Sequence, residues 1–356
     1  MPGERIAVLS PTTIQFVEKI ACLDPPGGID VIGPAPSDRF GWNDYERRAP
    51  EWRDLGLNIR LDLRPYAEID FSRYDLLIET FETLFLDESW PAHSTHYSCP
   101  VVVKACWTRH PMEAPDGYIN KIKSVPLLLE MPAHVANWET CGFRDVNLVF
   151  NPVGHWWFEK PWTGADGRAV MVLSGRNQWR QQQHHGVDLL ERLSADFPGQ
   201  IYLHDGAETY RTSREMAELL RGARVFLALD EPYGNGERPL SLVFTEALSA
   251  GCPVAARDLP GLSYKNYIGG NGICTDQYEL LRDFVGKCLT DYDFASECSR
   301  MSRALAETLF SPAALLPQYE QVFERARQVW RRRQSQPRFY WFRPTVLSSF
   351  GTHSFG

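Results

Sequence analysis

Short apolar runs alternate with helically patterned segments along the whole of this chain. In the first half the runs predict strands at about 5–10, 29–32, 58–63, 75–79, 101–106 and 146–152. The uninterrupted triplets that begin at Leu76 and Val101 are typical of parallel strands covered on both faces. Helical spacing predicts helices at 14–22 and between about 121 and 143. Strands that alternate with helices favour a parallel sheet with right-handed crossovers.

The second half continues the alternation. It predicts strands at 169–174 and 200–204, a helix, turn and strand between 215 and 231, and helices at 186–194, 276–289 and 312–333. The segment 158–167, with Pro161, Gly164 and Gly167, is typical of a linker. We therefore expect an α/β protein with two doubly wound domains. Their predicted bounds are 1–158 and 159–311, followed by a crossover helix and a basic, aromatic tail at 312–356.

The stretch from 238 to 256 has the most informative pattern. Its apolar positions recur at helical spacing, and the face they form consists of Leu240, Val243, Phe244, Ala247 and Leu248. Ser241 suits the start of this helix and Gly251 the position after its end. Free amides at a helix start can bind a phosphate. Glu246 lies off the apolar face, where its carboxylate can either hold a ribose diol or simply be solvated.

This stretch and its flanks resemble the nucleotide-sugar domain of retaining GT-B glycosyltransferases of the family-4 type, also called glycosyl transferases group 1. The residues that carry the resemblance run from Glu246 to Val254, as Glu-Ala-x-x-x-Gly-x-Pro-Val. The resemblance implies two Rossmann-like domains that face a central cleft. It also implies sugar transfer from a UDP- or GDP-linked donor with retention, without a metal or other cofactor. Glu246 would hold the ribose of the donor.

The resemblance names further candidates for the diphosphate and the sugar. Arg176 follows a strand in a turn similar to the family's Gly-Arg turn, with Arg180 as the nearest fixed cation and His185 at the place of the family's lysine. The amides near Ser241 and Leu242 would serve the same phosphates. The family's sugar-side glutamate falls at Arg238, and Glu237 stands one residue earlier. Either side chain can therefore serve the sugar.

Candidates in the first half follow its predicted strands. Glu79 and His110 lie on the carboxyl-end rim of the sheet, where ligands of such folds bind. His110 is a candidate for contact with sugar or acceptor, and so are His93 and His96, which we assign to a polar loop. The histidine spacing is not that of a metal site. Trp156, Trp157 and Trp162 are expected to pack the hinge rather than stack on a sugar.

Composition narrows the classes of protein and the compartment. The net charge is -8, which does not favour a nucleic-acid surface. None of the eight cysteines forms a Cys-x-x-Cys pair, and those at 22, 106 and 252 are expected to be buried. There is no Walker motif, no Gly-x-Gly-x-x-Gly after the first strand, no signal-peptide core and no apolar stretch near 20 residues. We expect a cytoplasmic protein.

The tail at 331–356 leaves other readings open. Its arginines and aromatic residues suit anionic lipid or nucleic acid, although packing under the first domain is favoured. Membrane association and an acceptor that is a glycan, lipid-linked or of another kind therefore remain open. Two alternatives to the transferase are a non-catalytic homologue that acts as a partner, and an enzyme that acts on nucleic acid or lipid through the tail.

Arg238 stands where the family has its sugar-side glutamate, and this difference can be tested. If Glu237 serves the sugar, Glu237→Gln will lower turnover strongly and leave the affinity for free nucleotide nearly unchanged. If Arg238 serves it, Arg238→Ala will weaken the binding of a donor whose sugar carries a carboxylate more than the binding of a donor with a neutral hexose. The reason is that a bidentate pair is lost. Steady-state kinetics and calorimetric titration measure both effects. Neither assignment survives if both variants behave as the parent protein does.

Overall fold

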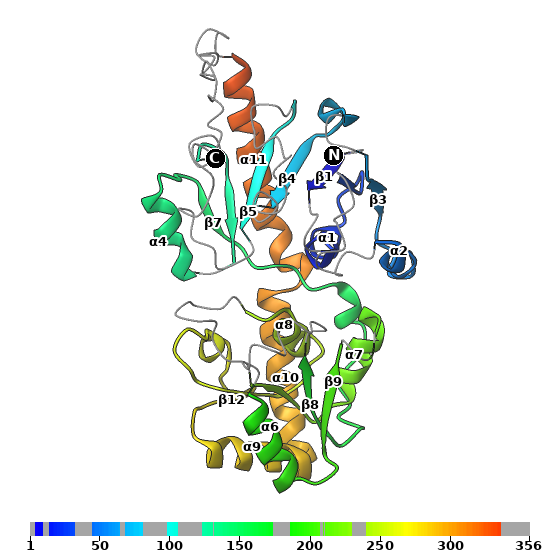
Figure 1. The fold of residues 1–356 in the computed structure, drawn as a ribbon, viewed down its shortest axis with the longest axis vertical. Helices are drawn as coiled ribbons and strands as arrows, with labels where there is room; N and C mark the ends of the chain where they lie inside the picture. The colour runs from blue at the N-terminus through cyan, green and yellow to red at the C-terminus, as the bar shows by residue number, and fades with distance from the viewer. Residues whose placement is uncertain are drawn as a thin grey trace, which may run out of the picture.

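The protein has two parallel sheets, one in each half of the chain (Figure 1). In this computed structural model the described residues are 4–9, 14–32, 45–64, 68–80, 98–105, 123–130, 132–173, 186–206, 209, 211–229 and 240–335. The sheets lie one above the other in Figure 1, and helices cover both of them.

The first sheet has seven parallel strands in the order β3-β2-β1-β4-β5-β6-β7. The strands are β1 (Ile6–Leu9), β2 (Ile29–Ile32), β3 (Ile59–Asp62), β4 (Leu76–Thr80), β5 (Val101–Ala105), β6 (Leu127–Leu129) and β7 (Val146–Leu148). Every residue of β1, β2, β5 and β6 is buried, as expected for strands covered on both faces.

The described helices of this half are α1 (Ile14–Ala21), α2 (Tyr45–Asp54), the short η3 (Phe71–Arg73) and α4 (Pro132–Thr140). The prediction of helical structure from 121 to 143 was wrong in part. β6 lies within that range, and only α4 is helical among its described residues. Three leucines are too few to distinguish a buried strand from a helix turn by periodicity.

The second sheet has five parallel strands in the order β12-β11-β10-β8-β9. They are β8 (Ala169–Leu173), β9 (Ile201–Asp205), β10 (Val225–Ala228), β11 (Val254–Ala256) and β12 (Gly272–Cys274). The accompanying helices are α6 (Val187–Asp196), α7 (Ser213–Gly222), α8 (Leu242–Ser249), η7 (Tyr264–Tyr267), α9 (Tyr278–Thr290) and α10 (Tyr292–Leu309). Strand β12 was not predicted, because glycine-rich sequence of this kind usually forms a loop.

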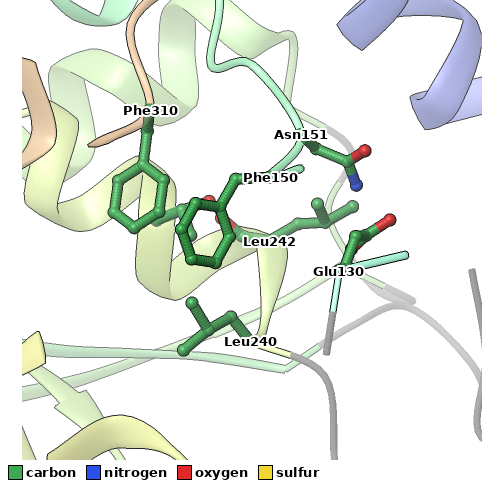
Figure 2. Close-up of a pocket in the computed structure, with 7 residues that line it drawn as sticks. Glu130, Phe150, Asn151, Leu240, Leu242 and Phe310 are labelled. Atoms are coloured by element: carbon green, nitrogen blue, oxygen red, sulfur yellow. The ribbon is translucent and has the colours of Figure 1, made fainter. Parts of the chain in front are cut away.

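The chain crosses between the halves twice, and the two crossings touch. Val153 donates its amide to the carbonyl of Phe310 at 2.8 Å, and the rings of Phe150 and Phe310 meet edge to face with centroids 5.4 Å apart (Figure 2). After the second crossing, α11 (Pro312–Ser335) packs against β4 and β5 of the first sheet.

The first crossing also carries the predicted hinge tryptophans. Trp156 and Trp157 lie in the short helix η6 (His155–Trp157), and both are buried, as is Trp162. Trp162 donates its indole N–H to the Ala223 carbonyl at 2.7 Å. The Arg221 guanidinium donates to the carbonyl of Trp156. The prediction that these tryptophans pack the hinge is confirmed.

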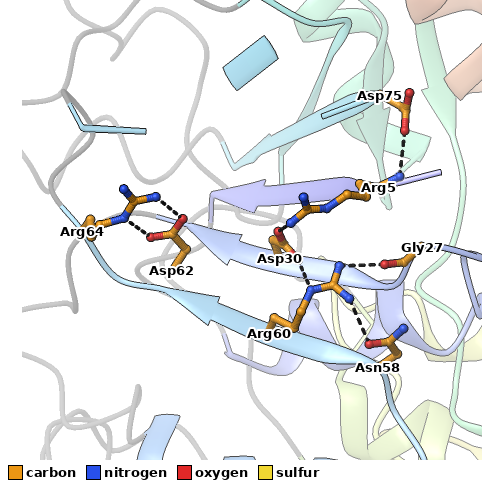
Figure 3. A network of polar contacts seen from close by, with 8 residues as sticks. All are labelled: Arg5, Gly27, Asp30, Asn58, Arg60, Asp62, Arg64 and Asp75. Carbon is orange, nitrogen blue, oxygen red and sulfur yellow. Dashed lines mark hydrogen bonds and ion pairs between the residues drawn. The ribbon is translucent and has the colours of Figure 1, made fainter. Parts of the chain in front are cut away.

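A polar network ties the first three strands of the first sheet together (Figure 3). Asp30 of β2 is almost fully buried and accepts hydrogen bonds from Arg5 and, at 2.6 Å, from Nε of Arg60. Arg60 also donates to the Gly27 carbonyl at 2.6 Å. At the far end of β3, Asp62 accepts two bonds of 2.7 Å from Arg64, which lower the pKa of the Asp62 carboxyl.

Asp30 and Asp62 give a matched pair of variants. Asp30→Asn removes a buried charge that two guanidiniums share, and we expect it to lower the free energy of unfolding by roughly 1.5–3 kcal/mol. The control Asp62→Asn breaks a pair in water and should change stability little. Urea unfolding at a constant m-value measures both. Equal losses of unfolding free energy in the two variants would show that the burial of Asp30 does not determine its contribution to stability.

Candidate functional site

Helix α8 has the start and end that its sequence predicts. Phe244, Ala247 and Leu248 are fully buried on its apolar face. Ser241 is the N-cap residue, and Gly251 follows the helix with φ +77, which favours glycine. A Cβ at Gly251 would also lie 3.2 Å from Ser299 and Trp162. The chain therefore turns sharply from α8 into β11.

The start of α8 faces the carboxyl edge of the first sheet across a pocket (Figure 2). The pocket is small: its cavity volume is about 10 Å³, room for roughly one water molecule. Its described lining residues come from both halves and are Glu130, Phe150, Asn151, Leu240, Leu242, Thr245 and Phe310. Ser241 makes no side-chain cap bond, so the amides of the first helical turn are not capped by it. The geometry combines amide donors with a small polar and apolar cavity.

Glu246 lies one turn after Leu242 and reaches the first half of the chain. Lys19 of α1 donates from Nζ to Glu246 Oε1 at 2.8 Å. The Lys19 side chain is 5% exposed and that of Glu246 18% exposed. Burial alone would lower the pKa of Lys19, but the Glu246 carboxylate outweighs it, and the pKa is raised. The Lys19 ammonium therefore keeps its charge, and its bond to Glu246 joins the two halves.

Further buried charges lie beside this pair. Glu18 accepts from the Trp52 indole at 2.8 Å, and Arg48 lies 3.5 Å from the same carboxylate oxygen. Burial raises the pKa of Glu18, opposed by Arg48 and by the Trp52 bond. Glu51 accepts from Arg48 at 2.9 Å and from the amide of Ser213, at the start of α7. A carboxylate at a helix start is favoured by the helix dipole.

The predicted site residues divide into three groups. Ser241, Leu242 and Glu246 are brought together on α8. Glu79 lies at the end of β4 and is fully buried, so it belongs to the interior and not to the open rim. The remaining candidates lie outside the described residues; they are His93, His96, His110, Arg176, Arg180, His185, Glu237 and Arg238.

The structure adds residues that the sequence analysis did not single out. Glu18 and Lys19 stand next to each other in the mostly apolar helix α1. Lys104 is the one charged residue of the apolar strand β5. Lys104 is fully buried, with Nζ 2.7 Å from Oε1 of Glu130. A lysine within a strand covered on both faces is the signal that could have found this site.

Within the described ranges, no cluster of three or more His, Cys, Asp or Glu residues is arranged to hold a metal ion. No described helix is both long enough and apolar enough to span a membrane.

Comparison with known proteins identifies the fold. No family model matches the sequence, and no curated protein matches it. HepE of Anabaena, solved with UDP, is 14% identical, aligns over 91% of this chain and 100% of its own, and has a TM-score of 0.63. HepE was also solved with UDP-glucose. The chain has the GT-B fold, which confirms the predicted fold class.

Other solved structures share this fold at low identity. A glycosyltransferase from Rickettsia africae is 8% identical, with a TM-score of 0.60 over 92% of this chain and 99% of its own. Sucrose-phosphate synthase from Thermosynechococcus elongatus is 12% identical, with a TM-score of 0.55 over 90% and 98%.

The ion pair between the halves can be tested by a double-mutant cycle. Lys19→Met leaves the Glu246 carboxylate partly buried without its cation, and we expect a loss of roughly 3 kcal/mol in the free energy of unfolding. Glu246→Leu should cost a similar amount, because it strands the ammonium. The double variant Lys19→Met/Glu246→Leu should recover most of the loss. Strictly additive losses in chemical denaturation would show that the pair does not couple the halves.

Proposed function

We propose that this protein transfers a sugar from a nucleotide-sugar donor bound between its two halves. The observation that carries the proposal is the position of Glu246. Its carboxylate lies on α8 one turn from the pocket, at the boundary of the halves, in a GT-B fold. The complexes of HepE with UDP and UDP-glucose support a nucleotide sugar as the ligand.

Binding of the ribose involves Lys19. A carboxylate can accept from both hydroxyls of a diol, and one oxygen of Glu246 is held by Lys19 in this structure. The nucleotide must therefore displace the ammonium from Oε1 or share the carboxylate with it. Either route links nucleotide binding to the contact between the halves, because Lys19 and Glu246 belong to different halves.

The chemical step needs stabilisation of the leaving diphosphate. In our proposal the diphosphate lies at the start of α8, where the free amides and the helix dipole favour negative charge. The sequence resemblance assigns three side chains to the phosphates, Arg176, Arg180 and His185. These groups replace the role of a metal ion in our proposal. Transfer with retention needs no protein nucleophile if the leaving phosphate accepts the proton of the acceptor. His110 is the residue of the first half that we assign to sugar or acceptor.

A non-catalytic partner protein is the second candidate function. The observation in its favour is that Lys19 already occupies the carboxylate assigned to the ribose. In that case the pair would be purely structural, and no nucleotide would compete for it. The two candidates therefore differ in nucleotide binding.

The proposal predicts selective stabilisation by nucleotides. UDP or GDP should raise the melting temperature of the full chain, since a ligand that binds only the folded state stabilises it by mass action. For the nucleotide that binds, Glu246→Gln should weaken the binding free energy by roughly 1.5–3 kcal/mol, or about 10- to 150-fold in affinity. The reason is the loss of charged hydrogen bonds to a diol. Thermal-shift assays and calorimetric titration measure these effects.

The control is Glu279→Gln, which makes the same chemical change on the exposed surface of α9. It should bind nucleotide as the parent protein does. If no UDP, GDP, ADP or CDP binds the parent protein, the transferase is rejected and the non-catalytic function is favoured. Equal affinities of the parent protein and Glu246→Gln would remove the ribose assignment alone.

A further inference from the structure

Basic side chains are concentrated at the end of this chain. The last 32 residues, 325–356, contain seven arginines and neither aspartate nor glutamate, although the whole chain has a net charge of -8. The described part of this segment is the end of α11, where Arg331, Arg332 and Arg333 are consecutive. Like charges in one block repel each other, and such a block is typical of a surface that binds a polyanion.

The fold brings further cations to the end of α11. Arg333 donates to the hydroxyl of Ser124, which places the adjacent Lys123 beside the helix end. Cδ of Lys123 lies 3.8 Å from where a Cβ at Gly142 would be, in the turn between α4 and β7. Arg144 follows Gly142 by two residues in the same turn. Cations from three separate parts of the chain therefore lie together.

The acids of this region are fewer than its cations. Asp145 lies 3.1 Å from Nε of Arg325, and Glu324 lies 3.2 Å from Arg331. Glu139 is in the last turn of α4. The six cations that meet here, which we call the basic face, are Lys123, Arg144, Arg325, Arg331, Arg332 and Arg333.

Most of the basic face is open to water. Lys123, Arg144, Arg331 and Arg332 are exposed. Within the part of the chain that the structure describes, Arg144 and Arg332 form no ion pair. The Arg331 side chain is 65% exposed, so its pair with Glu324 is a weak surface pair. Exposed guanidinium groups can bind phosphate through two parallel hydrogen bonds.

The basic face lies at the edge of the first sheet that is turned away from α8. Lys123 precedes β6 and Arg144 precedes β7, so both lie at the amino edge of these parallel strands. The pocket lies at the carboxyl edge. Figure 1 shows the end of α11 at the top of the molecule, far from the second sheet. A large anionic surface can therefore approach the basic face without covering the boundary between the halves.

Aromatic residues accompany these arginines. Trp330 is partly exposed and directly precedes Arg331. Beyond the described residues, the sequence Phe-Tyr-Trp-Phe at 339–342 stands between two further arginines, at 338 and 343. Tryptophan and tyrosine beside basic residues are typical of the headgroup region of a bilayer, where the ring is in apolar surroundings and its polar atom meets water. The combination favours a lipid surface over a nucleic acid.

We propose that the basic face docks on a membrane that contains anionic phospholipids. The lipid phosphates pair with the exposed arginines, and the aromatic residues at the end of the chain enter the headgroup region. Six cations fall within the roughly four to eight that such lipid-binding clusters contain. The inference does not rest on the proposed function, because it concerns the opposite edge of the sheet.

Vesicle flotation with the full chain tests the proposal. Vesicles of phosphatidylcholine and phosphatidylglycerol, about two to one, are compared with vesicles of phosphatidylcholine alone. We expect the protein to float with the anionic vesicles only, and to be released when salt rises from roughly 0.1 to 0.5 M. Arg144→Gln/Arg331→Gln/Arg332→Gln should lower the affinity for anionic vesicles by about tenfold or more, because three cations at the surface are lost.

The matched control is Arg53→Gln/Arg282→Gln/Arg300→Gln. It makes the same change in net charge on exposed parts of α2, α9 and α10. Its affinity should stay within about twofold of that of the parent protein, because distant exposed charges are screened by salt. Urea unfolding should give all variants the free energy of unfolding of the parent protein, since the replaced side chains are exposed.

A charge-retaining variant separates charge from shape. Arg144→Lys/Arg331→Lys/Arg332→Lys should bind anionic vesicles nearly as the parent protein does. The proposal is overturned if the parent protein binds neither vesicle type or both equally, or if the lysine variant or the control loses as much affinity as the glutamine variant. It is also overturned if the glutamine variant loses affinity for duplex RNA and keeps its affinity for vesicles. That result would assign the basic face to nucleic acid.

Discussion

The ion pair between Lys19 and Glu246 fixes how the two halves of this protein meet. Both groups are largely removed from water, so each needs the other, and they come from different halves. Shape complementarity alone would tolerate small sliding between the halves, whereas a 2.8 Å bond does not. The pair joins α1 to α8, whose start lies opposite the carboxyl edge of the first sheet across the pocket.

Several buried charges lie near this boundary. These charges include Lys104 with Glu130, Glu18 with Arg48, and Glu51, which accepts from the amide at the start of α7. The strand centres carry the apolar side chains that stabilise each half. Buried charges cost stability, and the fold tolerates these because each lies close to a partner of opposite charge or to a hydrogen-bond donor.

Much of the fold could be predicted from the chain. The strands of the first sheet other than β6, the helix α8 with Ser241 and Gly251 at its ends, and the long last helix follow from apolar periodicity and helix signals. β6 and β12 could not be predicted, because three-residue strands have no period and depend on neighbouring strands. Of the residues around the pocket and the Lys19–Glu246 pair, the sequence pointed to those of α8 alone. Lys19 and Glu130 form ion pairs with residues distant in sequence, and no local pattern identifies such partners.

The return of α11 to the first sheet has a consequence for biosynthesis. The helix covers β4 and β5, and its Arg327 and Arg325 pair with Glu4 and Asp145 of the first half. During synthesis the first 150 residues leave the ribosome long before α11 does, and one face of their sheet stays uncovered in the meantime. The second sheet and its helices come from one continuous stretch, 169–309, so this half can fold as soon as that stretch has been made. The order of maturation is therefore the reverse of the order of synthesis: the half made first is completed last.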